Sequence, residues 1–214
     1  MKPILADSFY HIYNRGINGE SIFKEEKNYS YFLRKYAVFI PFVADTYAYC
    51  LMGNHFHLLV KTKSEEEIQK FYRERQNDDE GEKRKTSFET KSSLKDTSWI
   101  ISNAFSSLFK SYSISINKEY KRTGALFERP FRRKLITSDR YLSQVIYYIH
   151  ANPQDHGFCK DFTDYPHSSF HAHLSSKQTK LARKEVLSWF GSPEDYKQFH
   201  SLNQNINDLI IEFD

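Results

Sequence analysis

The chain has 214 residues, of which 39% are hydrophobic and 27% charged, and its formal net charge is +4. No apolar run reaches the roughly 18 residues that a membrane span requires, and the N-terminus lacks the apolar stretch of a secretory signal. The two cysteines, Cys50 and Cys159, form neither a disulfide framework nor a Cys-x-x-Cys metal knuckle. These features predict a soluble, cytoplasmic protein with no membrane partner.

The first 62 residues predict a strand, a helix and a hairpin. An alternating segment rich in aromatic side chains is typical of a strand, whereas Tyr29, Phe32 and Tyr36 have the spacing of one helix face. The dipeptide Gly53-Asn54 favours a tight turn between two β-rich segments. The predicted elements are a strand at 8–15, a turn at 16–19, a helix at 27–39, and strands at 43–51 and 55–62.

The remainder of the chain predicts longer helices and one more strand. Ser64, followed by three glutamates, is a typical helix start. The charged segment 76–93 has almost no large apolar side chains and predicts an exposed loop or disordered insertion. Pro130 inside the strand-like segment 127–136 indicates an edge strand or a bulge. Further helices are predicted at 64–75, 94–120 and 138–152, the last ended by Pro153, then loops to 174 and weakly helical residues to the end.

The order of these elements predicts an α/β (α+β) fold. Strands and helices alternate around a hairpin, which favours a small antiparallel sheet with helices packed on one face. The other face would then be open, and we expect the chemistry there.

Positive charge is concentrated in one part of the chain. Residues 110–140 hold nine basic and three acidic side chains, a local charge of +6, while the rest of the chain sums to -2. Such a block is typical of a surface that follows phosphates, but equally of a solvated face that keeps a protein soluble. Charge alone leaves both interpretations open.

Two histidines alternate along the predicted strand 55–62. Side chains of a strand alternate between its faces, so His55 and His57 share one face while Phe56 points to the other. The two imidazoles are then roughly 7 Å apart, near enough to share one divalent cation. Imidazole suits Mn, Zn or Co, and a carbonyl or carboxylate third ligand admits Mg as well. The alternative is that both histidines merely line a half-exposed strand.

The predicted helix 138–152 has an apolar stripe and two adjacent tyrosines. On a helical wheel Tyr147 points nearly opposite the stripe, toward solvent, whereas Tyr148 lies at its flank on the same edge as Asn152. A phenol is a poor nucleophile near neutral pH, and it acts when a cation polarises the target phosphate. Tyr148 is therefore a candidate nucleophile. The alternative is an aromatic side chain that packs at the helix flank.

Five segments together resemble one protein family. MGNHFHLLV (52–60), GALFERPFRRKLI (124–136) and YIHANPQDHGF (148–158) resemble the HUH single-tyrosine transposases, most closely the REP-associated tyrosine transposases. YHIYNRGINGESIF (10–23) and YPHSSFHAHL (165–174) fit the same branch. The resemblance runs in collinear order from residue 8 to about residue 175.

The resemblance implies a domain organisation and a set of site residues. It implies a ferredoxin-like catalytic domain at 1–158, which contains the charged insertion 76–93, and a C-terminal extension at 159–214. The implied site consists of His55 and His57 as metal ligands, Asn152 as a polar third ligand, Tyr148 as nucleophile, and Arg129, Arg132, Arg133 and Lys134 along the DNA backbone.

The implied reaction is metal-assisted transesterification of single-stranded DNA that carries a hairpin next to the cleavage site. The cofactor would be Mg or Mn, and the intermediate a 5′-phosphotyrosine link that a 3′-OH later attacks to rejoin the strand. Family members act as monomers or as homodimers, and both states stay open. The alternative function is a non-catalytic nucleic-acid-binding protein on a ferredoxin-like fold.

Overall fold

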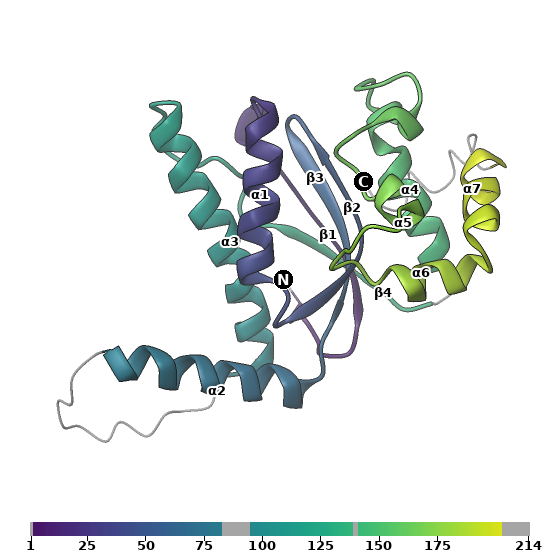
Figure 1. Ribbon diagram of the computed structural model, residues 1–214. Coiled ribbons are helices and arrows are strands. Elements are labelled where there is room, and N and C mark those ends of the chain that lie inside the picture. Colours follow the sequence, from purple (N-terminus) through teal and green to yellow (C-terminus); the bar gives the residue numbers. More distant parts are fainter. Residues whose placement is uncertain (1, 83–94, 139–140, 203–214) are drawn as a thin grey trace.

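The computed structural model describes residues 2–82, 95–138 and 141–202. Four strands form one antiparallel sheet in the order β2-β3-β1-β4, with helices around it (Figure 1). The strands are β1 (Phe9–Arg15), β2 (Ala44–Met52), β3 (His55–Thr62) and β4 (Arg132–Ile136). The predicted antiparallel sheet of a mixed α/β fold is confirmed, and the strand order is that of a ferredoxin-like unit.

One face of the sheet packs against α1 (Glu26–Phe39) and α3 (Thr97–Glu119). Strand alternation sends Ile12 of β1 and Phe56 of β3 to this face, where both are fully buried. Phe32 of α1 meets Phe56 with ring centroids 5.3 Å apart. Full burial of one such side chain stabilises the fold by about 1.5–3 kcal/mol. This face is therefore an ordinary apolar core.

The opposite face is covered as well, which corrects the prediction that it is open. Helix α4 (Leu142–Asp155) lies against β2 and β3, and its apolar stripe packs on Cys50, Met52 and Leu59. The stripe that the sequence shows on this helix must be buried somewhere, and α1 and α3 already occupy the first face. Helices thus lie on both sides of the sheet (Figure 1).

The residues after α4 complete this second core. They form η3 (Phe162–Asp164), α5 (Phe170–Leu174), α6 (Arg183–Phe190) and α7 (Pro193–Leu202). Phe162 and Tyr196 pack with α4. The same stretch covers the β2 edge, because the amide of Leu51 donates to His167 O at 2.9 Å and that of Ser169 to Tyr49 O at 2.9 Å. The division of the chain at 158/159 stays a prediction, but both parts share this core.

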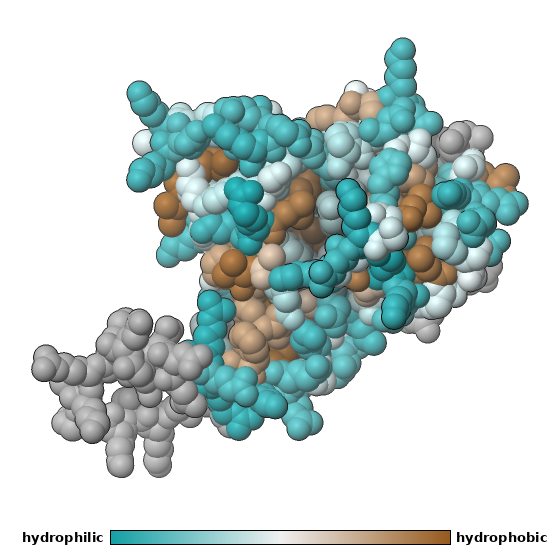
Figure 2. All heavy atoms as spheres, in the orientation of Figure 1, coloured by the Kyte–Doolittle hydropathy of each residue, from teal (hydrophilic) through white to brown (hydrophobic). Residues whose placement is uncertain are grey.

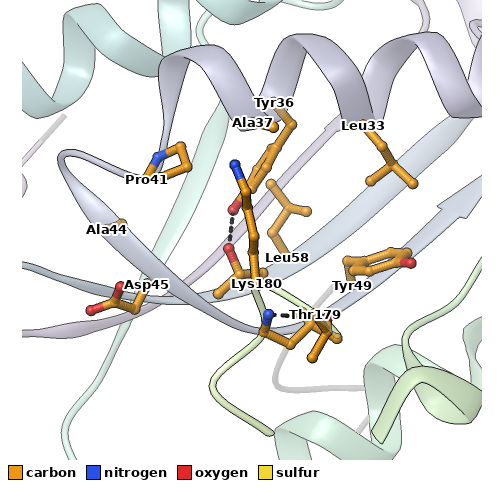
Figure 3. Close-up of a pocket in the computed structure, with 12 residues that line it drawn as sticks. Leu33, Tyr36, Ala37, Pro41, Ala44, Asp45, Tyr49, Leu58, Thr179 and Lys180 are labelled. Carbon is orange, nitrogen blue, oxygen red and sulfur yellow. Dashed lines mark hydrogen bonds between the residues drawn. The ribbon is translucent and has the colours of Figure 1, made fainter. Parts of the chain in front are cut away.

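A second contact of the extension closes a pocket. The amide of Ala182 donates to Thr46 O at 2.9 Å, which holds residues 179–182 along β2. Between this segment, α1 and β2 lies a cavity of about 180 Å³ (Figure 3). Lys180 extends along it, and the Tyr36 and Thr46 hydroxyls bond at 2.8 Å within it. Figure 2 shows hydrophobic residues between hydrophilic ones over this face of the molecule. None of the predicted site residues lines the cavity.

Two helix ends differ from the prediction. Helix α2 (Glu65–Glu82) continues through the first part of the predicted loop, although the Asn, Asp and Gly residues of that part are weak helix formers. Residues 83–93 of that loop lie outside the described residues. Helix α4 continues past Pro153, whose missing N–H costs one bond in the last turn, while the amide of His156 still donates to Asn152 O at 3.0 Å.

The other predicted elements occur near their expected bounds, except that the strand predicted at 127–136 begins only at Arg132 and the predicted loop up to 174 contains η3 and α5. The turn at 16–19 contains η1 (Ile17–Gly19), and Gly16 is required there because a Cβ would lie 2.0 Å from Glu20 O. Strand β4 begins after Pro130 and is an edge strand, as that proline indicates. Across the described residues, no helix has the length and apolarity to cross a membrane.

Candidate active site

The β2–β3 hairpin places the two histidines of the sequence motif on the α4 side of the sheet. Phe56 lies in the core with α1 and α3, whereas His57 faces α4, so the predicted alternation is confirmed. The rings of His55 and His57 have centroids 5.3 Å apart. His57 is 4% exposed and His55 is half-buried.

Each of these rings is bonded at Nδ1. Asn54 Oδ1 lies 2.7 Å from His55 Nδ1. His11 Nε2, on the neighbouring strand β1, lies 2.8 Å from His57 Nδ1. The rings of His11 and His57 are stacked, with centroids 5.0 Å apart and an interplanar angle of 15°. The ring of Tyr13 stacks on that of His11, with the two ring centroids 4.8 Å apart.

Burial keeps His11 and His57 neutral. It lowers the pKa of His11 to about 3, with the charge of Lys134 as a second cause. Burial also lowers the pKa of His57 well below its usual value, and the neighbouring histidines act in the same direction. A neutral imidazole is the form that ligates metals.

Helix α4 and its C-cap residue, His156, present a row of side chains to the histidine pair. Tyr148 meets His57 edge-on at 5.6 Å between ring centroids and lies 5.7 Å from His11. Two turns later, the ring of His156 lies 4.8 Å from that of His55. Positions 148, 152 and 156 share one helix edge, so Asn152 lies between these two contacts.

The side chain of Asn152 is suited to ligation. It is fully buried, and its Nδ2 donates to Tyr148 O at 3.0 Å. Its Oδ1 has no hydrogen-bond partner among the described residues. Buried amide oxygens without a partner are costly and rare, and a cation would satisfy this one. By contrast, the residues described contain no group of three His, Cys, Asp or Glu side chains arranged to hold a metal.

Both tyrosines of α4 are more buried than the sequence predicts. Tyr148 is 4% exposed and Tyr147 6%, although Tyr147 is expected to point to solvent. The cause is the extension, since Phe162 and Phe199 pack around the Tyr147 ring at 6.0 and 6.4 Å. Burial raises the pKa of Tyr147 to about 12.

A polar cluster joins α4 to the extension just beside the nucleophile candidate. His150 is fully buried, its Nε2 lies 2.7 Å from Ser169 Oγ, and its Nδ1 lies 3.0 Å from His200 Nε2. Burial lowers the pKa of His150 well below its usual value and that of His200 to about 4. These bonds link α4 to the extension two residues after Tyr148.

The four predicted DNA-binding residues divide between the two faces of the sheet. In the β1–β4 register Arg132 pairs with Tyr13 and Lys134 with His11, so both lie on the histidine side. Arg133 lies on the other side, where its guanidinium donates to Lys2 O at 2.6 Å. Arg129 is exposed in the segment before β4.

The histidines open onto a pocket of about 430 Å³. Arg15, which pairs with His55 across the β1–β3 ladder, lies at the pocket wall with Arg132 and Glu128. Glu128 Oε1 accepts from Arg15 Nε at 2.6 Å, and its Oε2 lies 3.9 Å from Arg132. The pocket thus combines imidazoles with two guanidinium groups, a combination suited to phosphate.

Comparison with known proteins leads to the same family as the sequence motifs. No family model matches the chain. A Haemophilus influenzae protein whose name places it among the REP-associated tyrosine transposases is 31% identical over 78 residues, which are 36% of this chain. The chain spans 41% of that relative's length. The expected resemblance to these transposases is confirmed.

A solved structure of a REP-associated tyrosine transposase bound to a REP hairpin has a similar fold. It aligns with a TM-score of 0.54 at 12% identity, over 82% of this chain and 84% of that one. At this identity the likeness supports the fold.

Sequence reasoning missed two side chains that line the histidine pocket, Arg15 and His156, and one buried behind it, His11. His11 and Arg15 alternate with Tyr13 along β1, which puts all three on one face. That alternation is the signal that could have found them. His156 lies two turns after Tyr148 on the same helix edge, but the expected helix end at Pro153 hid it.

Proposed function

We propose that this protein cleaves and rejoins single-stranded DNA beside a hairpin, as a single-tyrosine transposase, through a covalent link to Tyr148. The observation that carries the proposal is the contact between the rings of Tyr148 and His57 within one chain, 5.6 Å between centroids. The relative named as a transposase and the hairpin-bound solved structure support the same reaction class and substrate.

His55, His57 and Asn152 would hold a divalent cation, Mg or Mn. The partnerless Oδ1 of Asn152 and the neutral state of His57 support this set. When bound, the cation offsets the negative charge of the scissile phosphate.

Tyr148 performs the exchange of bonds. Its Oη forms a bond to phosphorus and loses its proton to solvent, while the bond from phosphorus to the 3′ oxygen breaks and that oxygen takes up a proton from solvent and leaves as a 3′-OH. The reverse attack by a 3′-OH rejoins the strand and restores the phenol. One phosphodiester replaces another, so the cycle needs no nucleotide hydrolysis. Because the Tyr148 side chain is only 4% exposed, we expect DNA binding to displace some of the residues that bury it before the attack.

The basic side chains on the histidine face would bind the DNA backbone. Arg132 and Lys134 of β4 and Arg15 of β1 lie there together, and neutralised phosphates release counterions. Exposed Arg129 extends this surface toward the segment before β4. Arg133, on the opposite face, would contribute least.

A single chain would suffice for the reaction. His57 and Tyr148 of the same chain are in contact, so no second subunit is needed to bring nucleophile and metal ligands together. We therefore propose that the monomer is active.

The second candidate is a non-catalytic protein that binds DNA hairpins. The burial of Tyr148 favours it, since a buried phenol cannot reach phosphorus without a conformational change. It predicts binding that is indifferent to a chelator and yields no covalent product.

The two candidates are separated by a denaturing gel. The protein is incubated with a pool of hairpin-bearing single strands in Mn²⁺ or Mg²⁺, with and without a chelator. We expect a chelator-sensitive protein–DNA adduct that Tyr148→Phe abolishes and Tyr147→Phe retains. Binding without any adduct would favour the non-catalytic candidate.

A further inference from the structure

The two histidines of the β3 motif are each fixed through Nδ1, but by different neighbours. Asn54, in the hairpin turn, bonds to His55 at 2.7 Å, and His11, on β1, bonds to His57 at 2.8 Å. A neutral imidazole carries one proton, so the bond made by one ring nitrogen decides what the other can do.

We propose that Asn54 and His11 are positioning residues that hold His55 and His57 in the Nδ1–H tautomer. Each Nε2 then carries a lone pair, which is the form in which an imidazole ligates a divalent cation. This inference rests on the metal-dependent reaction proposed above, and it identifies two residues that prepare the site before the cation binds.

The tautomer of His55 follows from the chemistry of its partner. An amide oxygen only accepts, so His55 Nδ1 must donate to Asn54 Oδ1, and the lone pair resides on Nε2. The backbone of Asn54 is held as well, because its carbonyl accepts from the amide of Gly16 at 2.8 Å. Next to it, Gly53 O accepts from Ile22 at 2.8 Å and from Phe23 at 2.9 Å. These backbone bonds hold the turn in the position from which the Asn54 side chain contacts His55.

The tautomer of His57 depends on which of two nitrogens carries the shared proton. If His57 Nδ1 donates, His11 Nε2 accepts, and His57 Nε2 keeps its lone pair. The reverse arrangement would protonate His57 Nε2 and leave the pair with one ligating nitrogen. His11 is fully buried and stacked on both Tyr13 and His57, so its ring cannot turn away.

This arrangement corresponds to a general property of metal sites. A ligating histidine usually donates its second N–H to a fixed acceptor, which sets the ring's orientation and raises its basicity. Here the two acceptors come from the hairpin turn and from the adjacent strand. The sheet itself thus organises both ligands.

The test measures tautomers and metal affinity separately. Long-range ¹H–¹⁵N NMR correlations on the metal-free protein report which ring nitrogen of each histidine is protonated, and titration with Mn²⁺ alone reports affinity. Asn54→Ala and His11→Phe remove the acceptors. Asn54→Asp keeps an acceptor oxygen, and His11→Gln puts one in place of the ring nitrogen. Tyr13→Phe is the control, because it retains the stacked ring.

We expect both histidines to be protonated at Nδ1 in the wild type. Asn54→Ala and His11→Phe should each give a tautomer mixture at one histidine and weaken Mn²⁺ binding about 10- to 100-fold. The acceptor variants should restore both readouts, which separates positioning from misfolding. Wild-type His57 or His55 protonated at Nε2 would overturn the inference, as would unchanged Mn²⁺ affinity in folded Asn54→Ala and His11→Phe. The predicted tautomers and affinities without a DNA adduct would support the inference while contradicting the proposed cleavage reaction.

Discussion

The two faces of the sheet bury different kinds of side chain. Against α1 and α3 the core is aromatic and aliphatic, with Phe32, Phe56 and Tyr112 fully buried. Against α4 the protein also buries histidines, among them His11, His57 and His150. Burying polar groups costs free energy unless they are hydrogen-bonded. Both faces therefore have an apolar core, and the second also buries histidines, whose mutual hydrogen bonds offset part of that cost.

Adjacent residues of β3 test this contrast most strongly. Phe56→Ala opens a cavity on the first face and should lower the free energy of unfolding by about 3–5 kcal/mol. His57→Ala, one residue away on the second face, should lower it by about 1–3 kcal/mol, mainly because His11 loses its partner. Urea denaturation measures both. If His57→Ala lowered the free energy of unfolding as much as Phe56→Ala does, the two faces would not differ in role.

Mixing two inactive chains tests whether the second face is a complete site. His57→Ala and Tyr148→Phe chains, each without adduct alone, should remain without adduct when mixed, because both groups act within one chain. A denaturing gel with labelled hairpin DNA is the readout, and wild type mixed with either variant is the control. Recovery of adduct in the mixture would indicate that subunits exchange the tyrosine.

The buried histidines should make stability depend on pH. His200 has a folded pKa of about 4, below the value of 6.5 for an unperturbed histidine. Above pH 6.5 both states are neutral and its contribution is fully present; below it the unfolded state takes up the proton first, so stability falls. At about pH 5 this amounts to about 2 kcal/mol from His200.

The matched variant is His200→Leu. The difference in unfolding free energy between about pH 7.5 and about pH 5 should shrink by about 2 kcal/mol relative to wild type. The same difference in both proteins would show that His200 is not the group that titrates.

The smallest effect distinguishes neighbours on β4. Arg132→Ala should weaken hairpin binding about 3- to 10-fold and reduce the salt slope by about 1, because it removes one phosphate contact. Arg133 lies on the other face, so Arg133→Ala should leave the affinity for the hairpin and the salt slope unchanged. Fluorescence anisotropy over a salt series measures the two. Equal losses would place DNA on both faces.

Much of the fold and part of the site can be predicted from the sequence. Strand periodicity identifies the β3 faces, and helical spacing finds α1, because each pattern reports burial directly. The grouping of Arg133 with Arg132 and Lys134 ignores the same alternation, which puts it on the opposite face.

Other features depend on contacts between distant segments. The partnership of His11 with His57 joins residues 46 positions apart, and no local pattern encodes it. The burial of Tyr147 follows from the extension, whose short helices have weak patterns of their own. Long-range packing of this kind overrides the helical wheel.

The central claim is that Tyr148 is the nucleophile, and peptide mapping of the adduct tests it most directly. The adduct formed on hairpin-bearing single-stranded DNA in Mn²⁺ is digested with nuclease and protease and analysed by mass spectrometry. We predict a nucleotide 5′-phosphate on Tyr148. A nucleotide on Tyr147, or on any other side chain, would contradict it.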